Sequence, residues 1–319
     1  MFFPLALGGA MLIAGAGMHA AQDFPTKPIR FVVPFAPGGG LDILARLFSP
    51  RLSESLGQSV VVDNRPGASG AIGLELTARA RPDGYTLVLM SASHVIHAIV
   101  SRTPYDLFRD FAPVTQTSAS SYVLVVSPGF AAQSVVELIA HAKSDPGRLN
   151  YASSGNATLQ HLATELLAGM TGIKLVHVPY KGVGSMLPDL MSGRVQMALS
   201  SATALAPAIR SKSVRPLAVT GTQREAILAD VPTMAEAGVP GFVVTQWHGV
   251  LAPSGTPREV VTHLQREIAK TLRQPEMAAR LAHDGTVIVG SAPQAFAAFL
   301  ASERDKWGKV VTQTGIRVE

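Results

Sequence analysis

Short runs of apolar, largely β-branched residues alternate along this chain with longer segments in which apolar residues recur every three or four positions. The first pair joins the run Ile29 to Val33, through a glycine-rich turn, to the helical pattern from Leu41 to Leu56. Because this alternation is typical of βα units, it predicts parallel strands connected by helices. Further strand-like runs occupy residues 60–62, 86–90, 122–126, 175–178, 195–200, 217–220 and 249–252.

Three segments carry the signal of a helix start, in which a hydroxyl residue precedes a Glu or Gln by three positions. They are Ser134 to Glu137, Thr256 to Glu259 and Ser291 to Gln294. In such a capping box the hydroxyl accepts a hydrogen bond from an N–H of the first helical turn. Pro50 lies inside the first helical pattern, and we expect it to kink or divide that helix because its ring removes a donor.

The chain opens with an almost wholly apolar stretch, Met1 to Gly17, followed by small residues that suit cleavage after Ala20 or Ala21. We expect a signal peptide over residues 1–21, although the stretch lacks the usual Lys or Arg near its start. Pro4 and four glycines argue against a permanent membrane helix of about 20 residues. A retained anchor is the less favoured alternative, and the mature chain is expected to be soluble outside the cytoplasm.

The composition is that of a globular protein, with 319 residues of which 47% are hydrophobic and 15% charged. This length favours two lobes over a single core. The absence of cysteine excludes disulfides, thiolate zinc sites and a cysteine nucleophile. The net charge of +5 is spread without a polybasic run, so nucleic acid is not an expected partner, whereas a small anion is compatible with it.

The first glycine-rich loop, Pro34 to Asp42, joins a strand to a helix through Gly38, Gly39 and Gly40. Uncovered N–H groups beside the positive end of a helix dipole suit an oxyanion. The alternative is a turn that needs glycine for its dihedral angles. No Gly-Lys-Ser/Thr and no GxGxxG register follows, so nucleotide binding is disfavoured. For Asp42, a structural role at the helix N-terminus is favoured over catalysis.

Three further loops follow the carboxyl ends of expected strands, where open α/β sheets bind ligands. The loop Tyr151 to Thr158 offers hydroxyls and backbone donors, and Ser154, Asn156 or Thr158 would cap the helix that follows; an ordinary capped helix start is the alternative. The other two loops are Ser91 to His94 and Pro179 to Gly182.

No arrangement of residues in the sequence indicates catalysis. Gly67 to Ala71 misses the nucleophile-elbow pattern at its last position, and no HExxH segment occurs. His94 and His97 are three apart, but no carboxylate cluster completes a metal site. His161 is favoured as a structural residue over a ligand contact. We therefore expect no enzyme, no cofactor and no metal.

Several segments that these arguments single out occur in a fixed order along the chain. They extend over nearly all of the expected mature chain, from about Phe24 to the C-terminus. The segments are Pro34 to Asp42, Asn64 to Gly70, Pro82 to Thr86, Ser153 to Gly155 with His161 to Ala163, His177 to Gly182, Val231 to Thr233 with Glu236 to Gly238, and Ala252 to Pro257.

This ordered set resembles the Bug-type solute-binding proteins of tripartite tricarboxylate transporters. The resemblance implies a type II periplasmic-binding-protein fold, with two α/β lobes around a ligand cleft and a chain that crosses between the lobes twice. Lobe one would comprise residues 24–121 plus 245–319, and lobe two residues 122–244.

The resemblance also implies that a ligand carboxylate lies between the loop at Ala36–Gly40 and the loop at Ser153–Thr158, held largely by backbone donors and water. The chain departs from the usual family pattern at Asn156 to Thr158 and at Gly182 to Ser185, and these departures affect the far end of the ligand. Five side chains are expected to contribute selectivity, namely Ser91, His94, Asn156, Tyr180 and Thr203, the last of which follows another expected strand. The predicted ligand-binding residues are Ala36, Pro37, Gly38, Gly39, Gly40, Asp42, Ser91, His94, Ser153, Ser154, Gly155, Asn156, Thr158, Tyr180 and Thr203.

The expected function is capture of a small organic carboxylate by hinge closure and its delivery to the membrane subunits of a tripartite tricarboxylate-type transporter. A periplasmic receptor that feeds a signalling partner shares the fold and ligand and is the alternative. A hydrolase of small carboxylic esters is less favoured, because no acid, base or nucleophile set is apparent. Di- and tricarboxylates, acidic amino acids, aromatic acids and neutral amides all fit as ligands, and a monomer is expected.

Overall fold

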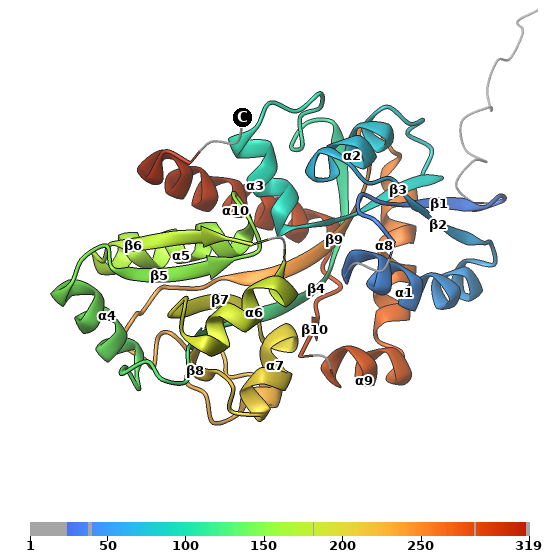
Figure 1. Ribbon diagram of the computed structural model, residues 1–319. Coiled ribbons are helices and arrows are strands. Elements are labelled where there is room, and N and C mark those ends of the chain that lie inside the picture. The colour runs from blue at the N-terminus through green and yellow to red at the C-terminus, as the bar shows by residue number, and fades with distance from the viewer. Residues whose placement is uncertain (1–23, 38–39, 181, 284, 317–319) are drawn as a thin grey trace, which may run out of the picture.

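The computed structural model describes residues 24–37, 40–180, 182–283 and 285–316 (Figure 1). Its elements are β1 (Ile29–Val33), α1 (Gly40–Leu56), β2 (Val60–Asn64), η1 (Ala68–Gly70), α2 (Ala71–Ala78), β3 (Thr86–Ser91), α3 (Ala92–Val100), β4 (Phe111–Val126), α4 (Val135–Ser144), β5 (Leu149–Ser153), α5 (Leu159–Thr171), β6 (Leu175–Pro179), α6 (Val183–Ser192), β7 (Met197–Ser201), α7 (Ala202–Arg210), β8 (Arg215–Val219), η2 (Ala226–Leu228), β9 (Thr245–Pro253), α8 (Arg258–Leu272), α9 (Pro275–His283), β10 (Val287–Ile288) and α10 (Pro293–Thr314).

The long strand β4 joins two regions of sheet. Within the described residues the strand order is β2-β1-β3-β9-β4-β7-β5-β6, with β8 and β10 also paired to β4. Residues 111–121 of β4 pair with β9, whereas Tyr122 to Val126 pair with β7 and β8. We call the part with β1, β2, β3, β9 and β10 the first sheet region, and the part with β5, β6, β7 and β8 the second. In Figure 1 the two regions extend to opposite sides of β4.

The predicted parallel βα units are present in both regions. Strand β1 is parallel to β2 and β3, and β5 is parallel to β6 and β7. The strands between them differ from the expectation, because β4 runs antiparallel to its partners β7, β8 and β9. The fold is therefore mixed, with parallel pairs at its two ends and antiparallel pairs in the middle.

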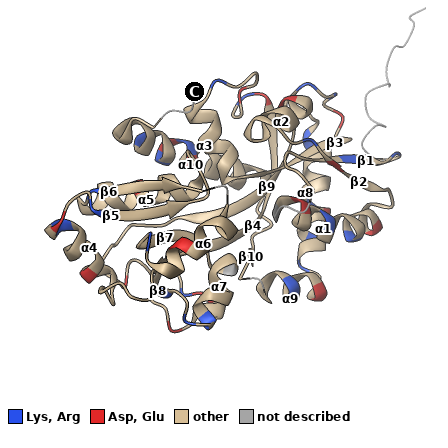
Figure 2. Ribbon diagram, viewed as in Figure 1, with Lys and Arg blue, Asp and Glu red and all other residues tan. Residues whose placement is uncertain are grey.

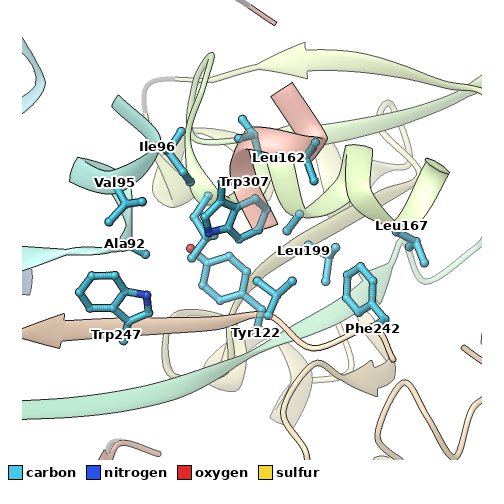
Figure 3. Close-up of a cluster of buried hydrophobic side chains, with 14 of the residues drawn as sticks. Ala92, Val95, Ile96, Tyr122, Leu162, Leu167, Leu199, Phe242, Trp247 and Trp307 are labelled. Atoms are coloured by element: carbon cyan, nitrogen blue, oxygen red, sulfur yellow. The ribbon is translucent and has the colours of Figure 1, made fainter. Parts of the chain in front are cut away.

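One cluster of buried side chains continues from the first sheet region into the second (Figure 3). Trp247 on β9 and Trp307 on α10 are fully buried in it, and the indole N–H of each donates to Oε2 of Glu303, at 2.9 and 3.0 Å. Helix α10 also lies against α3, β4 and α5. The last helix therefore packs on both regions and is fixed to β9 by a shared carboxylate.

The helices expected from capping signals all form, but only one uses the expected cap. The Ser134 side chain accepts from the backbone N–H of Glu137, as predicted. Thr256 instead donates to the carbonyl of Pro253, and the Ser291 hydroxyl accepts from the backbone N–H of Gln116. The caps predicted at Thr256 and Ser291 are therefore wrong, because a local turn engages the first hydroxyl and a distant strand engages the second. Helix α10 begins at a proline, which has no N–H to satisfy.

Helix α1 runs without interruption through Pro50, so the proline does not divide this helix, and a kink there stays a prediction. Pro50 is exposed, and its ring faces solvent rather than a packed neighbour. The neighbouring hydroxyls hold the same stretch together: Ser49 donates to the carbonyl of Ala45 and Ser53 to the carbonyl of Ser49. These two bonds follow the helical spacing of four residues across the proline.

The expected signal peptide, residues 1–21, lies outside the described residues. In the part of the chain that the structure describes, none of the helices combines the length and the apolar character needed to cross a bilayer.

Candidate functional site

A cleft of about 700 Å3 is lined from both sheet regions. Its volume is in the range of sites for small molecules. The first sheet region and its loops supply one wall, and the second region supplies the other, with β4 contributing to both. The lining residues are Phe35, Ala36, Pro37, Leu41, Ser91, Ser93, Ser120, Tyr122, Ser154, Gln160, Val183, Ser200, Ser201, Gln246 and His248.

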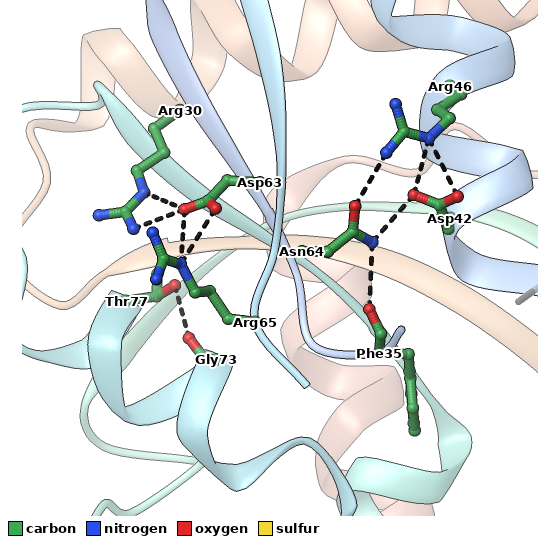
Figure 4. A network of polar contacts seen from close by, with 9 residues as sticks. All are labelled: Arg30, Phe35, Asp42, Arg46, Asp63, Asn64, Arg65, Gly73 and Thr77. Atoms are coloured by element: carbon green, nitrogen blue, oxygen red, sulfur yellow. Dashed lines mark hydrogen bonds and ion pairs between the residues drawn. The ribbon is translucent and has the colours of Figure 1, made fainter. Parts of the chain in front are cut away.

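The β1–α1 loop on the first wall is held in place by Asn64 at the end of β2 (Figure 4). Asn64 Nδ2 donates to the carbonyl of Phe35 at 3.1 Å and to Oδ1 of Asp42 at 2.9 Å. Arg46 donates to both Asp42 and Asn64. Asp42 is buried and does not line the cleft. Its carboxylate fastens the loop and the first turn of α1 to the sheet, which agrees with the structural role favoured for it.

Ser91 reaches the cleft at the junction of β3 and α3, and His94 lies behind it. The Ser91 N–H donates to Nδ1 of His94 at 3.0 Å, so this nitrogen is an acceptor. His94 is buried and is not part of the lining. Burial lowers the pKa of His94 to about 4, so the ring is neutral near pH 7. Ser91 is therefore part of the cleft lining, whereas His94 is not.

Three main-chain amides of the β5–α5 loop are bonded within the protein. The N–H of Ser154 donates to Oε1 of Gln160 at 2.5 Å, and that of Gly155 to Oγ of Ser153 at 3.1 Å. The N–H of Ala157 donates to Nδ1 of His161 at 3.1 Å. These three amides are therefore engaged by side chains of the protein in this structure.

The remaining predicted residues lie beside this loop rather than in the lining. Ser153 is buried with its hydroxyl 2.6 Å from Nε2 of His177, and Thr158 caps α5. The Tyr180 hydroxyl donates to Asp189 at 2.8 Å, and Asn156 is exposed. Gly38 and Gly39 lie outside the described residues, as do Lys181 and the side chain of Thr203, and Gly40 begins α1.

Four of the predicted residues thus share one cleft, namely Ala36, Pro37, Ser91 and Ser154. The others named above lie away from the lining or outside the described residues, and their contact with a ligand stays a prediction.

Sequence reasoning missed most of the second wall and the floor of the cleft. Ser200 and Ser201 end β7, so the rule that ligands bind at carboxyl ends of strands applies to them. Gln246 and His248 alternate along β9 with the buried Trp247, and this alternation was an available signal. Gln160 gave no signal of its own in the sequence.

The lining is uncharged. Among its described residues there is no Lys, Arg, Asp or Glu. Burial lowers the pKa of His248 to about 4, and its Nδ1 lies 3.1 Å from Oγ of Ser118. Burial also raises the pKa of Tyr122. Charged residues of both signs are instead spread over the outer helices and loops (Figure 2). At neutral pH the lining presents hydroxyl and amide groups rather than ions, and within the described residues no group of His, Asp and Glu has the form of a metal site.

Comparison of the sequence with known proteins shows that this chain is similar to a family of transporter receptors. The family profile described as "Tripartite tricarboxylate transporter family receptor" matches residues 44–316. A UPF0065 protein from the tcbD-tcbE intergenic region of Pseudomonas sp. (strain P51) is 42% identical over 306 residues, covering 95% of this chain and 91% of the relative. Protein BugT of Bordetella pertussis is 37% identical and covers 97% of each chain.

Solved structures give the same result. The R. palustris protein Rpa4515 with adipate has a TM-score of 0.79 at 40% identity, covering 92% of this chain and 99% of that one. The periplasmic binding protein BugD has a TM-score of 0.75 at 31% identity, with coverages of 93% and 100%. MatC from Rhodopseudomonas palustris with bound malate has a TM-score of 0.76 at 30% identity, with coverages of 90% and 100%. The predicted periplasmic-binding-protein fold is confirmed.

Proposed function

The chain belongs to the tripartite tricarboxylate transporter receptor family, which includes the Bug proteins, and from this premise we propose that it captures a small organic carboxylate in the cleft between its two sheet regions. The family is one of solute-binding receptors and not of enzymes. Its structural neighbours are periplasmic binding proteins, which supports a periplasmic location for this chain after removal of residues 1–21.

The observation that carries this proposal is the cleft itself, which is lined from both sheet regions by hydroxyl and amide groups. A hydrogen bond to a charged group contributes about 1.5–3 kcal/mol net. Four such bonds, less the cost of immobilising the ligand, amount to about −8 kcal/mol, which corresponds to micromolar affinity. A neutral lining therefore suffices for an anion.

The ligand class follows from the distribution of polar groups. Ser91 and Ser93 lie at one wall and Ser200 and Ser201 at the other, and the lining also includes apolar side chains such as Leu41 and Val183. This pattern suits a short dicarboxylate with one acid group at each wall. Relatives have been solved with adipate and with malate, and we propose an acid of this size for this chain.

Capture requires the two walls to approach each other. The proposed lobes are residues 24–121 plus 245–319, and 122–244. The change of partners along β4 supports this division, because residues up to Ser121 pair with β9 and residues from Tyr122 pair with β7 and β8. We propose that closure occurs about this point and that the closed form is delivered to the membrane subunits of the transporter. We also propose that the protein is a monomer.

The test is a thermal-shift screen of dicarboxylates, followed by calorimetry. An acid present at 100 times its dissociation constant should add about 2.7 kcal/mol of stability. Ser154→Trp should abolish the shift, because the large ring would occupy the cleft beside Gln160. Ser302→Trp, at an exposed position of α10, is the matched control and should retain it. Wild-type affinity in Ser154→Trp would refute the proposed site.

A further inference from the structure

The second wall of the cleft contains a bridge formed by the side chain of Gln160. This residue is 4% exposed and lies at the start of α5. Its Oε1 accepts from the N–H of Ser154 at 2.5 Å, and its Nε2 donates to Oγ of Ser200 at 2.7 Å. One amide therefore connects the β5–α5 loop to the end of β7.

The orientation of this amide is determined by its partners. The backbone N–H of Ser154 can only donate, so the atom that faces it must be the carbonyl oxygen of Gln160. The amide nitrogen then faces Ser200, whose hydroxyl must accept. In a flipped amide the NH2 group of Gln160 would face the N–H of Ser154, donor against donor, and this N–H would lose its acceptor, which is unfavourable.

The oxygen of Ser200 accepts from Gln160, and among the described residues no acceptor is found for its hydroxyl proton. Ser201 is in a similar position, since its oxygen accepts from the N–H of Ala204 to cap α7. Both residues line the cleft. A hydroxyl that already accepts from the protein offers its proton to whatever occupies the cleft.

We propose that Gln160 is a positioning residue that fixes the hydrogen-bond polarity of Ser200, so that this hydroxyl, beside that of Ser201, presents a donor to a carboxylate of the bound acid. This inference rests on the proposed function of the cleft. A carboxylate can accept from the two hydroxyls with one oxygen each, whereas a carboxamide has a single accepting oxygen, so that in the same pose its NH2 group would face one of these donors. The wall thus selects an acid over its amide without any charged side chain.

A hydrogen-bonding role of Gln160 leads to two predictions that a role in packing alone would not. First, Gln160 acts on the ligand through Ser200, so their contributions should be coupled. Second, the effect should depend on the chemistry of the ligand end group. Gln160→Met keeps the approximate shape of the side chain but removes both hydrogen bonds, and Ser200→Ala removes the hydroxyl alone.

The experiment measures, by calorimetry, the affinities of the wild type, the two single variants and the double variant for adipate and malate and for their diamides. Each single variant should weaken binding of the acid about tenfold or more, the value expected from losing one charge-assisted hydrogen bond. The double variant should be no weaker than the poorer single variant. Affinity for the diamide should change less, so that the preference for the acid falls.

A second measurement does not depend on any ligand. Amide hydrogen exchange of the free protein should show that Ser154 is protected in the wild type and in Ser200→Ala, and exchanges faster in Gln160→Met. If the wild type bound none of the four compounds, the proposed capture of a short dicarboxylate would be overturned. Binding by the wild type, with losses that multiply in the double variant or that are equal for acid and amide, would overturn the role of Gln160 alone. If Gln160→Met does not fold, Ser200→Ala decides the acid-to-amide preference.

Discussion

Replacement of Glu303 by leucine should destabilise the protein strongly. Glu303 is 3% exposed, and its Oε2 accepts from the indole nitrogens of Trp247 and Trp307, both of which are fully buried. Leucine would leave these two N–H groups without an acceptor. Each buried donor without a partner costs about 1–3 kcal/mol, so the expected loss is about 2–6 kcal/mol. The nearby Lys306, which pairs with the other carboxylate oxygen, would also lose its partner.

Glu303→Gln is the matched control, because the carbonyl oxygen of glutamine can still accept from both indoles. It should cost clearly less than the leucine variant, because both indoles keep an acceptor and only the charge opposite Lys306 is lost. Urea unfolding followed by tryptophan fluorescence measures both variants directly, since Trp247 and Trp307 are the two tryptophans of the chain. Equal midpoints for the leucine and glutamine variants would refute the reasoning, because they would show that the shared acceptor contributes nothing to stability.

Three further predictions concern other parts of the fold. Gly249→Ala should lower the free energy of unfolding in urea by about 1–3 kcal/mol, because the added methyl overlaps the ring of Phe296. Gly308→Ala, with open space around it, should instead stabilise α10 by about 0.5–1 kcal/mol. A Gly249→Ala variant more stable than Gly308→Ala would contradict the packing. Asn64→Ala should cost about 1–3 kcal/mol and weaken ligand affinity, because the carbonyl of Phe35 loses its donor, and unchanged calorimetry would remove this loop from the site. Stability should also fall as pH drops from about 6.5 to about 4, because His94 has a folded pKa of about 4 and the unfolded chain takes up the proton first. In His94→Gln the side-chain oxygen can still accept from the N–H of Ser91. The loss of stability between pH 7 and pH 5 should be about 2 kcal/mol smaller in this variant, and identical pH profiles would contradict the burial of a neutral ring.

The sequence pattern identified the strands that end at the cleft but only part of the strand that joins the two sheet regions. Strand β4 begins at Phe111, whereas the apolar run predicted it from residue 122. Its first half contains Thr115, Gln116, Thr117 and Ser118, which suggest a surface loop but are buried in the fold. Their polar groups are partly satisfied by distant partners, such as the carbonyl of Ser291 for Thr115. Such pairing depends on tertiary structure and is not visible in local periodicity.

The candidate site was likewise only partly predictable from local sequence patterns. The rule that ligands bind at carboxyl ends of strands led to Ser91 and Ser154, because it depends only on where strands stop. It did not lead to Gln160, whose amide matters because it meets Ser154 and Ser200, and the second of these is 40 positions away in the chain. The interpretation of the β5–α5 loop as a source of main-chain donors likewise depended on where its N–H groups point, which only the structure could provide.

The most direct test of the account is a crystal structure of the protein grown with adipate. We predict the acid between the two sheet regions, with one carboxylate oxygen within hydrogen-bonding distance of Oγ of Ser200 and the other end near Ser91 and the loop at Ala36 and Pro37. Adipate seated elsewhere on the molecule, or lying in the cleft with neither carboxylate facing these groups, would contradict the account.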